Sequence, residues 1–474
     1  MKKYQNKYII IFILCAISSI VQGCKKFLEA PLPIDQLATE TVFQSRATIN
    51  SAVNGMYNGM ASGTLHANYI RFTYWISDEG IITPLPGTEL GDIISGNIVA
   101  TNSNLIPWSW FYLPVFRANE IIAKMPSVDP AIMSEAEKKQ IIAAAKYVRA
   151  YEHFLMANSW GDIPLITSTS AAENLTKPRT PVTQVYAAVI KDLTEAAADL
   201  PTTVNTANSL TIHNRFQVMA LLAKVHLYLG NWSDAEAAAT EVINSGQYQM
   251  VTGVTNVFRR GSREAIFSFG STGTGLLFEN RAVVGWLTLP ASAGNATTNY
   301  CSLTSSVLNN FETGDQRRVN GNWVISLFGF NFPNKYLHNS AALAATIAAT
   351  PQDFIVQRLA EIYLIRAEAR AQQSKITGTN SAASDLNIVR NRAGLPNTTA
   401  STQATMLAAV EKERVSELFC EGHRWYDLKR TNRLNTVLGA LPHKSANYKP
   451  HYNLWPIPQS EMNTSPNLTQ NPGY

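Results

Sequence analysis

Three carboxylates near the C-terminal end of the chain have a spacing that could support acid–base chemistry. Glu413, Glu417 and Glu421 are four residues apart, so a helix would place them on one face. A pair of carboxylates is what glycoside hydrolysis requires. Ion pairs with cations of the same segment are the alternative; these cations are Arg414, Arg424, Lys429 and Arg430. We predict that the carboxylates stabilise the fold and do not catalyse.

Other catalytic and metal-binding patterns are missing from the sequence. It contains no C-x-x-C, H-E-x-x-H, G-x-G-x-x-G, P-loop or G-x-S-x-G motif. His423 lies beside Arg424, Trp425 and Tyr426, and polar groups so closely interleaved with aromatic rings usually hold helices together. We therefore predict no enzyme activity, no metal site and no cofactor.

Composition limits the classes of ligand. The chain has 474 residues, of which 46% are hydrophobic and 15% are charged, and the charged share is well below the roughly 25% typical of soluble proteins. Such a surface suits neutral polar ligands. The formal net charge is +5, but no basic patch stands out, so nucleic-acid binding is not expected.

The N-terminal segment has the features of an export signal. Lys2, Lys3 and Lys7 precede an apolar run, Tyr8–Ile20, that is too short for an ordinary transmembrane helix. Val21, Gln22 and Gly23 follow the run, and Cys24 comes next, which resembles a bacterial lipoprotein signal. We predict that residues 1–23 are a signal peptide, that Cys24 carries lipid and that residues 24–40 form a tether.

The elements that must position a site are mainly helical. Apolar residues recur at helical spacing in several segments joined by short connections, which indicates paired helices similar to tetratricopeptide hairpins. The expected helices are Val42–Met60, Pro114–Lys124, Glu135–Asn158, Val182–Leu200, Ile212–Leu229, Ser233–Asn244, Asp353–Gln373, Ser381–Ala393 and Thr405–Lys429. We expect a mainly α fold with little β structure.

Two long insertions interrupt this helical pattern, at about residues 61–107 and 270–350. The first is rich in Gly, Thr, Asn and Pro, and the charged residues of Ser271–Asn310 are Glu279 and Arg281. Long loops inside a compact domain are usually functional or disordered, and embedded aromatic residues favour function. We predict two irregular insertions on a single domain, residues 41–474.

Several motifs together resemble one known family. The segment ERVSELFCEGHRWYDLKR (Glu413–Arg430) resembles the signature of the SusD/RagB family of nutrient-binding outer-membrane lipoproteins. Further resemblances occur in the same order along the whole chain. They are Phe27–Glu29 with Pro31, Val53–Tyr57, Tyr147–Ala150 leading to Gly161–Leu165, Arg358–Ala369, Leu386–Arg390 with Arg392–Gly394, Leu454–Pro458 and Asn467–Tyr474.

The resemblance implies a binding protein without catalytic activity. Members of this family are lipid-anchored on the outer surface of Bacteroidota, cover a SusC-like TonB-dependent transporter, and deliver glycan fragments or, in some branches, peptides to it. It also implies a SusD-like fold of four tetratricopeptide-like hairpins with ligand-binding insertions. In some relatives, acidic residues follow the lipid cysteine and help to specify export to the cell surface. Lys25 and Lys26 stand at these positions here.

Ligand residues are expected in the insertions, because the signature belongs to the scaffold. Sugars present flat C–H faces that pack on aromatic rings, and polar tips suit a half-wet surface. The candidates for ligand contact are Trp286, Trp75, Trp323, Trp108 and Tyr300, each with core packing as the alternative. Trp110 is expected to be a scaffold residue.

The predicted function is capture of oligosaccharides or polysaccharide fragments at an outer-membrane surface and their delivery to the transporter. Three alternatives remain open: peptide capture by the same architecture, a surface glycosidase, and a tetratricopeptide adaptor without a small ligand. The sparse charge of the insertions disfavours peptides, and their aromatic residues disfavour the adaptor.

Overall fold

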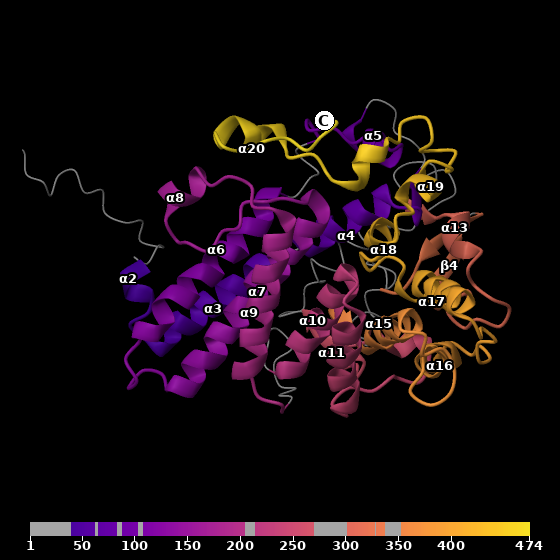
Figure 1. Ribbon diagram of the computed structural model, residues 1–474, viewed down its shortest axis with the longest axis horizontal. Helices are drawn as coiled ribbons and strands as arrows, with labels where there is room; N and C mark the ends of the chain where they lie inside the picture. Colours follow the sequence, from indigo (N-terminus) through magenta and orange to yellow (C-terminus); the bar gives the residue numbers. More distant parts are fainter. Residues whose placement is uncertain are drawn as a thin grey trace, which may run out of the picture. The chain divides into compact units, whose positions relative to one another are not determined.

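The computed structural model describes residues 39–61, 65–82, 88–102, 108–203, 214–269, 301–327, 329–336 and 352–474. The chain divides into two compact units, residues 1–49 and residues 50–474. The described residues are mainly helical and contain three two-stranded antiparallel sheets (Figure 1). The predicted mainly α fold with little β structure is confirmed.

Seventeen α-helices and six strands are described. The longer helices are α3 (Arg46–Ala61), α4 (Leu65–Ile76), α6 (Trp108–Lys124), α7 (Glu135–Trp160), α9 (Val182–Asp199), α10 (Arg215–Leu229), α11 (Trp232–Asn244), α15 (Leu359–Gln372), α16 (Ala382–Arg392) and α17 (Gln403–Leu418). The shorter ones are α2 (Thr39–Val42), α5 (Glu89–Ile94), α8 (Ala171–Leu175), α13 (Ser305–Leu308), α18 (Arg424–Arg430), α19 (Leu434–Leu438) and α20 (Gln459–Thr464). The strands are β1 (Gly80–Ile82), β2 (Ala265–Phe269), β3 (Cys301–Leu303), β4 (Val324–Leu327), β5 (Phe330–Pro333) and β6 (Phe354–Arg358).

The long helices pack in the order in which they occur in the sequence. Helix α6 packs on α7, α7 on α9, α9 on α10, α10 on α11, α11 on α15, and α15 on both α16 and α17. Figure 1 shows this succession of neighbouring helices. Sequential packing of this kind is the arrangement that the predicted helical hairpins require.

Local sequence signals produce the hairpin of α10 and α11. The Asn214 side chain accepts hydrogen bonds from the backbone N–H groups of Phe216 and Gln217. In turn, the Gln217 side chain accepts a hydrogen bond from the backbone N–H of Asn214. Gly230 ends α10 with a φ of 73°, a left-handed conformation that glycine adopts without a steric penalty. Helix α11 starts two residues later, so the two helices are antiparallel neighbours.

The core between α15, α16 and α17 combines alanines with larger aliphatic side chains. Ala360, Ala367 and Ala371 are fully buried on α15 and pack against Leu386 of α16 and Met406 of α17, among others. Small side chains allow helix axes to approach closely, so the C-terminal part of the scaffold is tightly packed.

The structure corrects four of the expected boundaries. The segment 61–107 is not irregular throughout, because it contains α4, β1 and α5. Residues Phe354–Arg358 form strand β6 and not the start of a helix, because they pair with β2. Pro114 lies inside α6 and does not begin it. The helix expected at Thr405–Lys429 is interrupted after Leu418, where Cys420 and Gly422 have φ angles of 60° and 80°.

Candidate functional site

The two predicted insertions are joined by an antiparallel strand pair. Gly80, Ile81 and Ile82 of β1 lie opposite Leu303, Ser302 and Cys301 of β3. The backbone N–H of Thr304 extends the pairing by donating to the Glu79 carbonyl over 3.0 Å. The first insertion, just after α4, therefore lies directly beside the part of the second insertion that contains β3.

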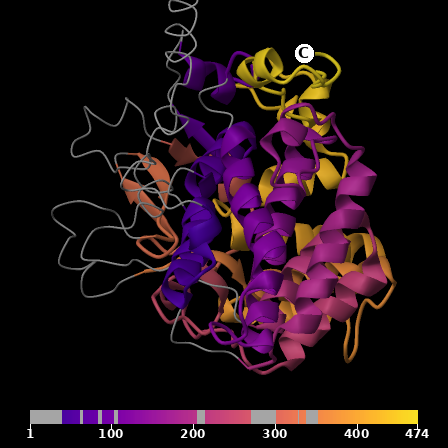
Figure 2. The same ribbon diagram turned by 90° about the vertical axis from the view of Figure 1, so that its left-hand side faces the viewer.

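A β-hairpin of strands β4 and β5 adds to this junction. Val324 pairs with Pro333 and Leu327 with Phe330, and β5 packs beside β3. Figure 2 shows the strands, in orange to brown, on one side of the helices. The structure thus gathers described parts of both insertions on one face.

The hairpin presents an aromatic ring next to polar groups. Phe330 is 39% exposed at the start of β5, whereas Phe332, which lies on the same side of the strand, is buried. Asn331 accepts hydrogen bonds from the Arg318 guanidinium (2.9 Å) and the Ser326 hydroxyl (2.7 Å). An exposed ring beside amide and guanidinium groups can pack on the C–H face of a sugar while its hydroxyls are hydrogen-bonded.

Sequence analysis did not select Phe330. The available signal was the F-G-F run at residues 328–330, in which Gly329 has a φ of 83° and permits a tight hairpin turn. A hairpin with one outward-facing aromatic residue follows from that pattern.

The signature segment holds the first insertion in place just before β1. The Arg424 guanidinium binds the Asp78 carboxylate through two hydrogen bonds of 2.8 Å. The backbone N–H of Cys420 donates to Glu79 Oε1 over 3.2 Å. Because Asp78 and Glu79 immediately precede β1, the signature fixes where the joined insertions begin.

Trp75 is a buried residue of α4. It is 3% exposed, the Arg71 guanidinium lies 5.5 Å from its ring centroid, and its carbonyl accepts a hydrogen bond from Lys444 over 2.6 Å. This burial favours core packing, the alternative stated for Trp75, and does not support ligand contact.

Trp323 is buried at the base of the hairpin. It is 1% exposed, and its indole N–H donates to the Val254 carbonyl over 2.8 Å. The cationic groups of Lys335 and Arg392 lie 4.6 and 5.2 Å from its ring centroid. The π face of Trp323 therefore interacts with cations of the protein itself. This again favours core packing over ligand contact.

Trp108 lies elsewhere, at the start of α6. It is 3% exposed and its ring makes an edge contact with Trp160 at 5.1 Å, so it has the scaffold role that we expected of Trp110. Trp110 itself is 38% exposed, which corrects that prediction. The remaining edge of Trp108 lines a cavity that is considered below.

The other predicted site residues, Trp286, Tyr300 and Cys24, lie outside the described residues. Their roles stay predictions.

The three spaced carboxylates belong to a buried ion-pair network. The Arg317 guanidinium lies 2.6 Å from Glu413 and 2.8 Å from Glu417, and Arg358 lies 2.7 Å from Glu421. Burial raises the pKa of Glu413. In Glu417 burial acts in the same direction, but Arg392, Arg358 and Arg317 outweigh it and hold the pKa below its ordinary value.

The network agrees with a structural role for these carboxylates. Glu413 and Glu417 are 2% and 0% exposed, whereas glycoside hydrolysis needs two carboxylates that reach substrate and water. Their cationic partners are not those expected from the same segment: Arg414 binds Asp427, and Arg430 binds Glu368.

His423 is also structural. Its ring is buried, with Nδ1 3.3 Å from Lys224 Nζ. Burial, and then the charge of Lys224, lowers the pKa of His423 well below its ordinary value. The imidazole is therefore neutral at physiological pH and not poised for proton transfer.

The described residues offer neither a metal-binding cluster nor a membrane-spanning helix. Within them, no group of three or more His, Cys, Asp or Glu side chains is arranged to hold a metal ion. None of the described helices combines the length and the apolar character needed to cross a membrane.

Comparison with known structures supports the fold. A laminarin-binding SusD-like protein superposes with a TM-score of 0.74 at 23% identity, covering 91% of this chain and 100% of the other. Surface glycan-binding protein A from Bacteroides fluxus gives a TM-score of 0.75 at 21% identity, with 91% and 100% coverage.

Comparison of sequences identifies the family. SusD-like protein P38 of Formosa agariphila is 24% identical over an alignment that covers both chains completely. A family model described as "Starch-binding associating with outer membrane" matches residues 26–227, and a model described as "SusD family" matches residues 304–474. One family model matches each half of the chain, and the similarity in fold and sequence continues between the two matched ranges. The chain therefore belongs to the SusD/RagB family.

Proposed function

We propose that this protein captures oligosaccharides or polysaccharide fragments at the outer membrane and delivers them, uncleaved, to a SusC-like TonB-dependent transporter. Glycan capture is supported by the starch-binding description of the matching family model and by the laminarin-binding and glycan-binding neighbours. The description of the same family model also supports association with the outer membrane. Delivery to the transporter rests on the resemblance to the family.

The observation that carries the proposal is the junction of the two insertions. Pairing of β1 with β3 makes one face from segments separated by more than two hundred residues, and the exposed ring of Phe330 lies on that face beside Asn331. An aromatic surface with neighbouring amide groups and little charge suits a neutral glycan. In this proposal Trp286 and Tyr300, from the same insertion as β3, complete the face.

The N-terminal segments attach this face to the membrane. Residues 1–23 are removed as a signal peptide, Cys24 carries lipid, residues 24–40 act as a tether, and residues 41–474 form the binding domain. The lipid inserts into the outer membrane and the binding domain faces the cell exterior, so that the domain covers the transporter.

Delivery requires binding of moderate strength. The ligand must leave again, so its binding energy should favour a closed state of the domain over the transporter without trapping it. No catalytic step is part of this function.

A binding screen tests the proposal. Protein expressed from the full sequence is tested against polysaccharides and peptide mixtures by affinity electrophoresis, followed by calorimetry and chromatography of the incubated glycan. Binding of a glycan without product formation supports glycan capture. Binding of peptides alone would transfer the protein to the peptide-capturing branch, and released sugars would indicate a glycosidase.

A further inference from the structure

A cavity of about 280 Å³ opens between α6 and the C-terminal tail. Its lining comes from α6, the segment that follows α7, helix α8 and the region around α20; among the residues are Trp108, Tyr112, Phe116, Asn174, Lys177 and Glu461. In Figure 1, α8 and α20 lie at the opposite end of the view from α13 and β4. The cavity is therefore separate from the face made by the joined insertions.

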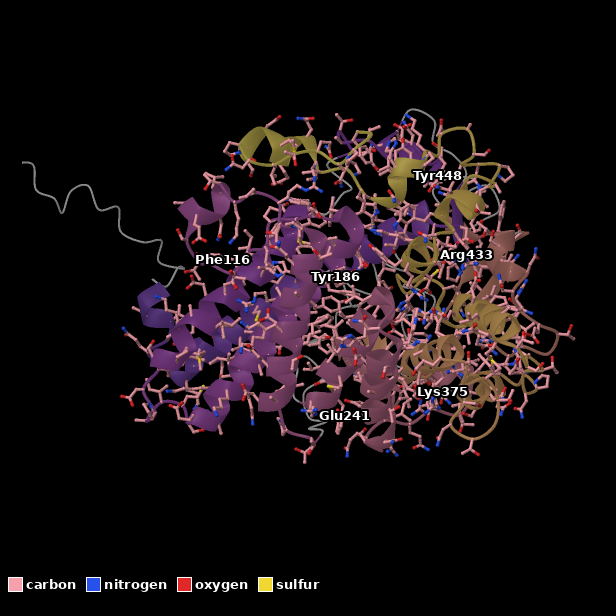
Figure 3. All side chains as sticks on the ribbon, viewed as in Figure 1. Phe116, Tyr186, Glu241, Lys375, Arg433 and Tyr448 are labelled. Carbon is pink, nitrogen blue, oxygen red and sulfur yellow. The ribbon has the colours of Figure 1, made fainter. Side chains whose placement is uncertain are left out.

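One wall of the cavity is aromatic and rigid. Trp108, Tyr112 and Phe116 are four residues apart on α6, so they lie along one side of the helix. Trp108 and Tyr112 make an edge contact at 5.7 Å, and the Tyr112 hydroxyl donates to the Pro164 carbonyl over 3.0 Å. Phe116, labelled in Figure 3, is 42% exposed and forms the part of the wall that is open to solvent.

The opposite wall contains an unsatisfied hydrogen-bond acceptor. The Asn174 amide nitrogen donates to the Ser168 carbonyl over 2.9 Å, but its Oδ1 atom is buried without a hydrogen-bond partner within the described residues. A buried acceptor without a partner is unfavourable by about 1–3 kcal/mol. The atom has almost no accessible surface, so a ligand satisfies it only when the Asn174 side chain turns toward the cavity.

Two further polar groups have opposite charge. Lys177 lines the cavity, as does Glu461, whose carboxyl pKa is raised by its partial burial. A lining with one cation and one anion offers both hydrogen-bond donors and acceptors. It has no excess of one charge that would select an anionic or cationic ligand.

We propose that this cavity is a second carbohydrate site that holds one neutral pyranose ring. The C–H face of the sugar packs on Phe116 and Tyr112, while its hydroxyl groups donate to Glu461 and accept from Lys177. The volume lies just below the roughly 300–1,000 Å³ of sites for drug-sized ligands, so a single ring fits better than an extended chain. An apolar side chain of a protein partner would cover the Glu461 carboxylate without hydrogen bonding to it.

This inference rests on the proposed function, because it assigns the cavity the same class of ligand as the insertion face. The two sites are separated in the structure, so their occupancy can be measured independently.

The test measures binding of single sugars to the full-length protein in detergent. Glucose, galactose, mannose and xylose are examined separately by saturation-transfer NMR and then titrated. We expect at least one of them to bind with millimolar affinity, and Phe116→Ala to weaken its binding about tenfold. Leu113→Ala is the matched control, since Leu113 is 47% exposed on the same helix but does not line the cavity; it should leave affinity within about twofold.

A second variant guards against loss of folding as the explanation. Ser465→Trp adds bulk to the cavity from the side of the C-terminal tail and should also abolish sugar binding, while thermal melting stays close to that of the unmodified protein.

The outcomes separate this inference from the proposed function. If polysaccharides bind but no single sugar binds in a Phe116-dependent way, the cavity assignment is overturned and glycan capture stands. If neither polysaccharides nor single sugars bind, both fail. If N-acetyl-tryptophan amide binds in a Phe116-dependent way and the sugars do not, the cavity recognises a protein side chain and the carbohydrate assignment is wrong.

Discussion

Arg424 of the family signature binds Asp78, which lies 346 residues earlier in the chain, through two parallel hydrogen bonds of 2.8 Å. The two side chains are 10% and 3% exposed, so the pair is largely removed from water. This bidentate contact connects the signature to the start of the joined insertions.

Arg424→Ala should destabilise the protein. The substitution leaves the Asp78 carboxylate buried without its two main donors, and breaking such a pair lowers the free energy of unfolding by about 3 kcal/mol or more. Urea denaturation measures the change. Lys375→Ala is the control. The Lys375 side chain is 48% exposed and pairs with Glu236, so its removal should change the free energy of unfolding by less than about 1 kcal/mol. Loss of glycan binding by Arg424→Ala at unchanged stability would show that the signature contacts ligand.

Glu79 should make stability depend on pH. Burial and the neighbouring Asp78 raise the pKa of Glu79 to about 8, so the folded protein holds this proton more tightly than the unfolded chain does. The contribution to stability is complete below the ordinary pKa of a glutamate and is lost as the pH rises toward 8.

Glu79→Gln should remove that dependence. Relative to the unmodified protein, the variant should gain stability between pH 5 and pH 8 by an amount on the order of 2 kcal/mol, because its amide can still accept from the Cys420 N–H. Urea unfolding at pH 5, 6.5 and 8 gives the comparison, with Glu173→Gln, an exposed carboxylate, as control. Parallel stability curves for Glu79→Gln and the unmodified protein would contradict the prediction.

Two aromatic substitutions on the hairpin should have opposite effects. Trp323→Ala should lower the free energy of unfolding by about 4 kcal/mol, because it empties a fully buried site. Phe330→Ala should leave stability nearly unchanged and weaken binding of the glycan found in the screen about tenfold, measured by calorimetry. Val319→Ala is the matched control, since Val319 is also exposed, at 47%, in the same region. Equal losses of affinity in Phe330→Ala and Val319→Ala would argue against a specific contact.

Cys24→Ala should release the protein from membranes. Without the acceptor thiol no lipid can be attached, so the protein is expected in the soluble fraction after cell lysis and in the aqueous phase of a detergent partition. Cys15→Ala, within the predicted signal peptide, should remain anchored. Continued membrane attachment of Cys24→Ala would rule out the lipid anchor.

The sequence allowed the helical scaffold to be predicted because its signals are local. The apolar face of Ile212–Leu229, its Asn214 cap and Gly230 all lie within one short segment, and the observed helix is Arg215–Leu229. Helix α4 was missed because the polar composition of residues 61–107 obscured the helical spacing of Tyr69, Phe72 and Ile76, which the structure buries.

Contacts between distant segments could not be predicted in the same way. The spacing of Glu413 and Glu417 predicted a shared helix face, but their partner Arg317 lies 96 and 100 residues away. The pairing of β1 with β3 likewise joins three-residue strands that carry no recognisable pattern of their own. For Trp75 and Trp323, the aromatic type suggested a ligand contact, whereas exposure depends on neighbours that the local sequence does not specify.

The short pairing of β1 with β3 also bears on how such proteins diversify. It holds the insertions through main-chain hydrogen bonds, and the side-chain requirement that stands out is Gly80, where a Cβ atom would clash with the Tyr74 ring. Loop residues beyond the pairing can therefore be replaced, and the chemistry of the exposed face with them, while the helices underneath keep their sequence.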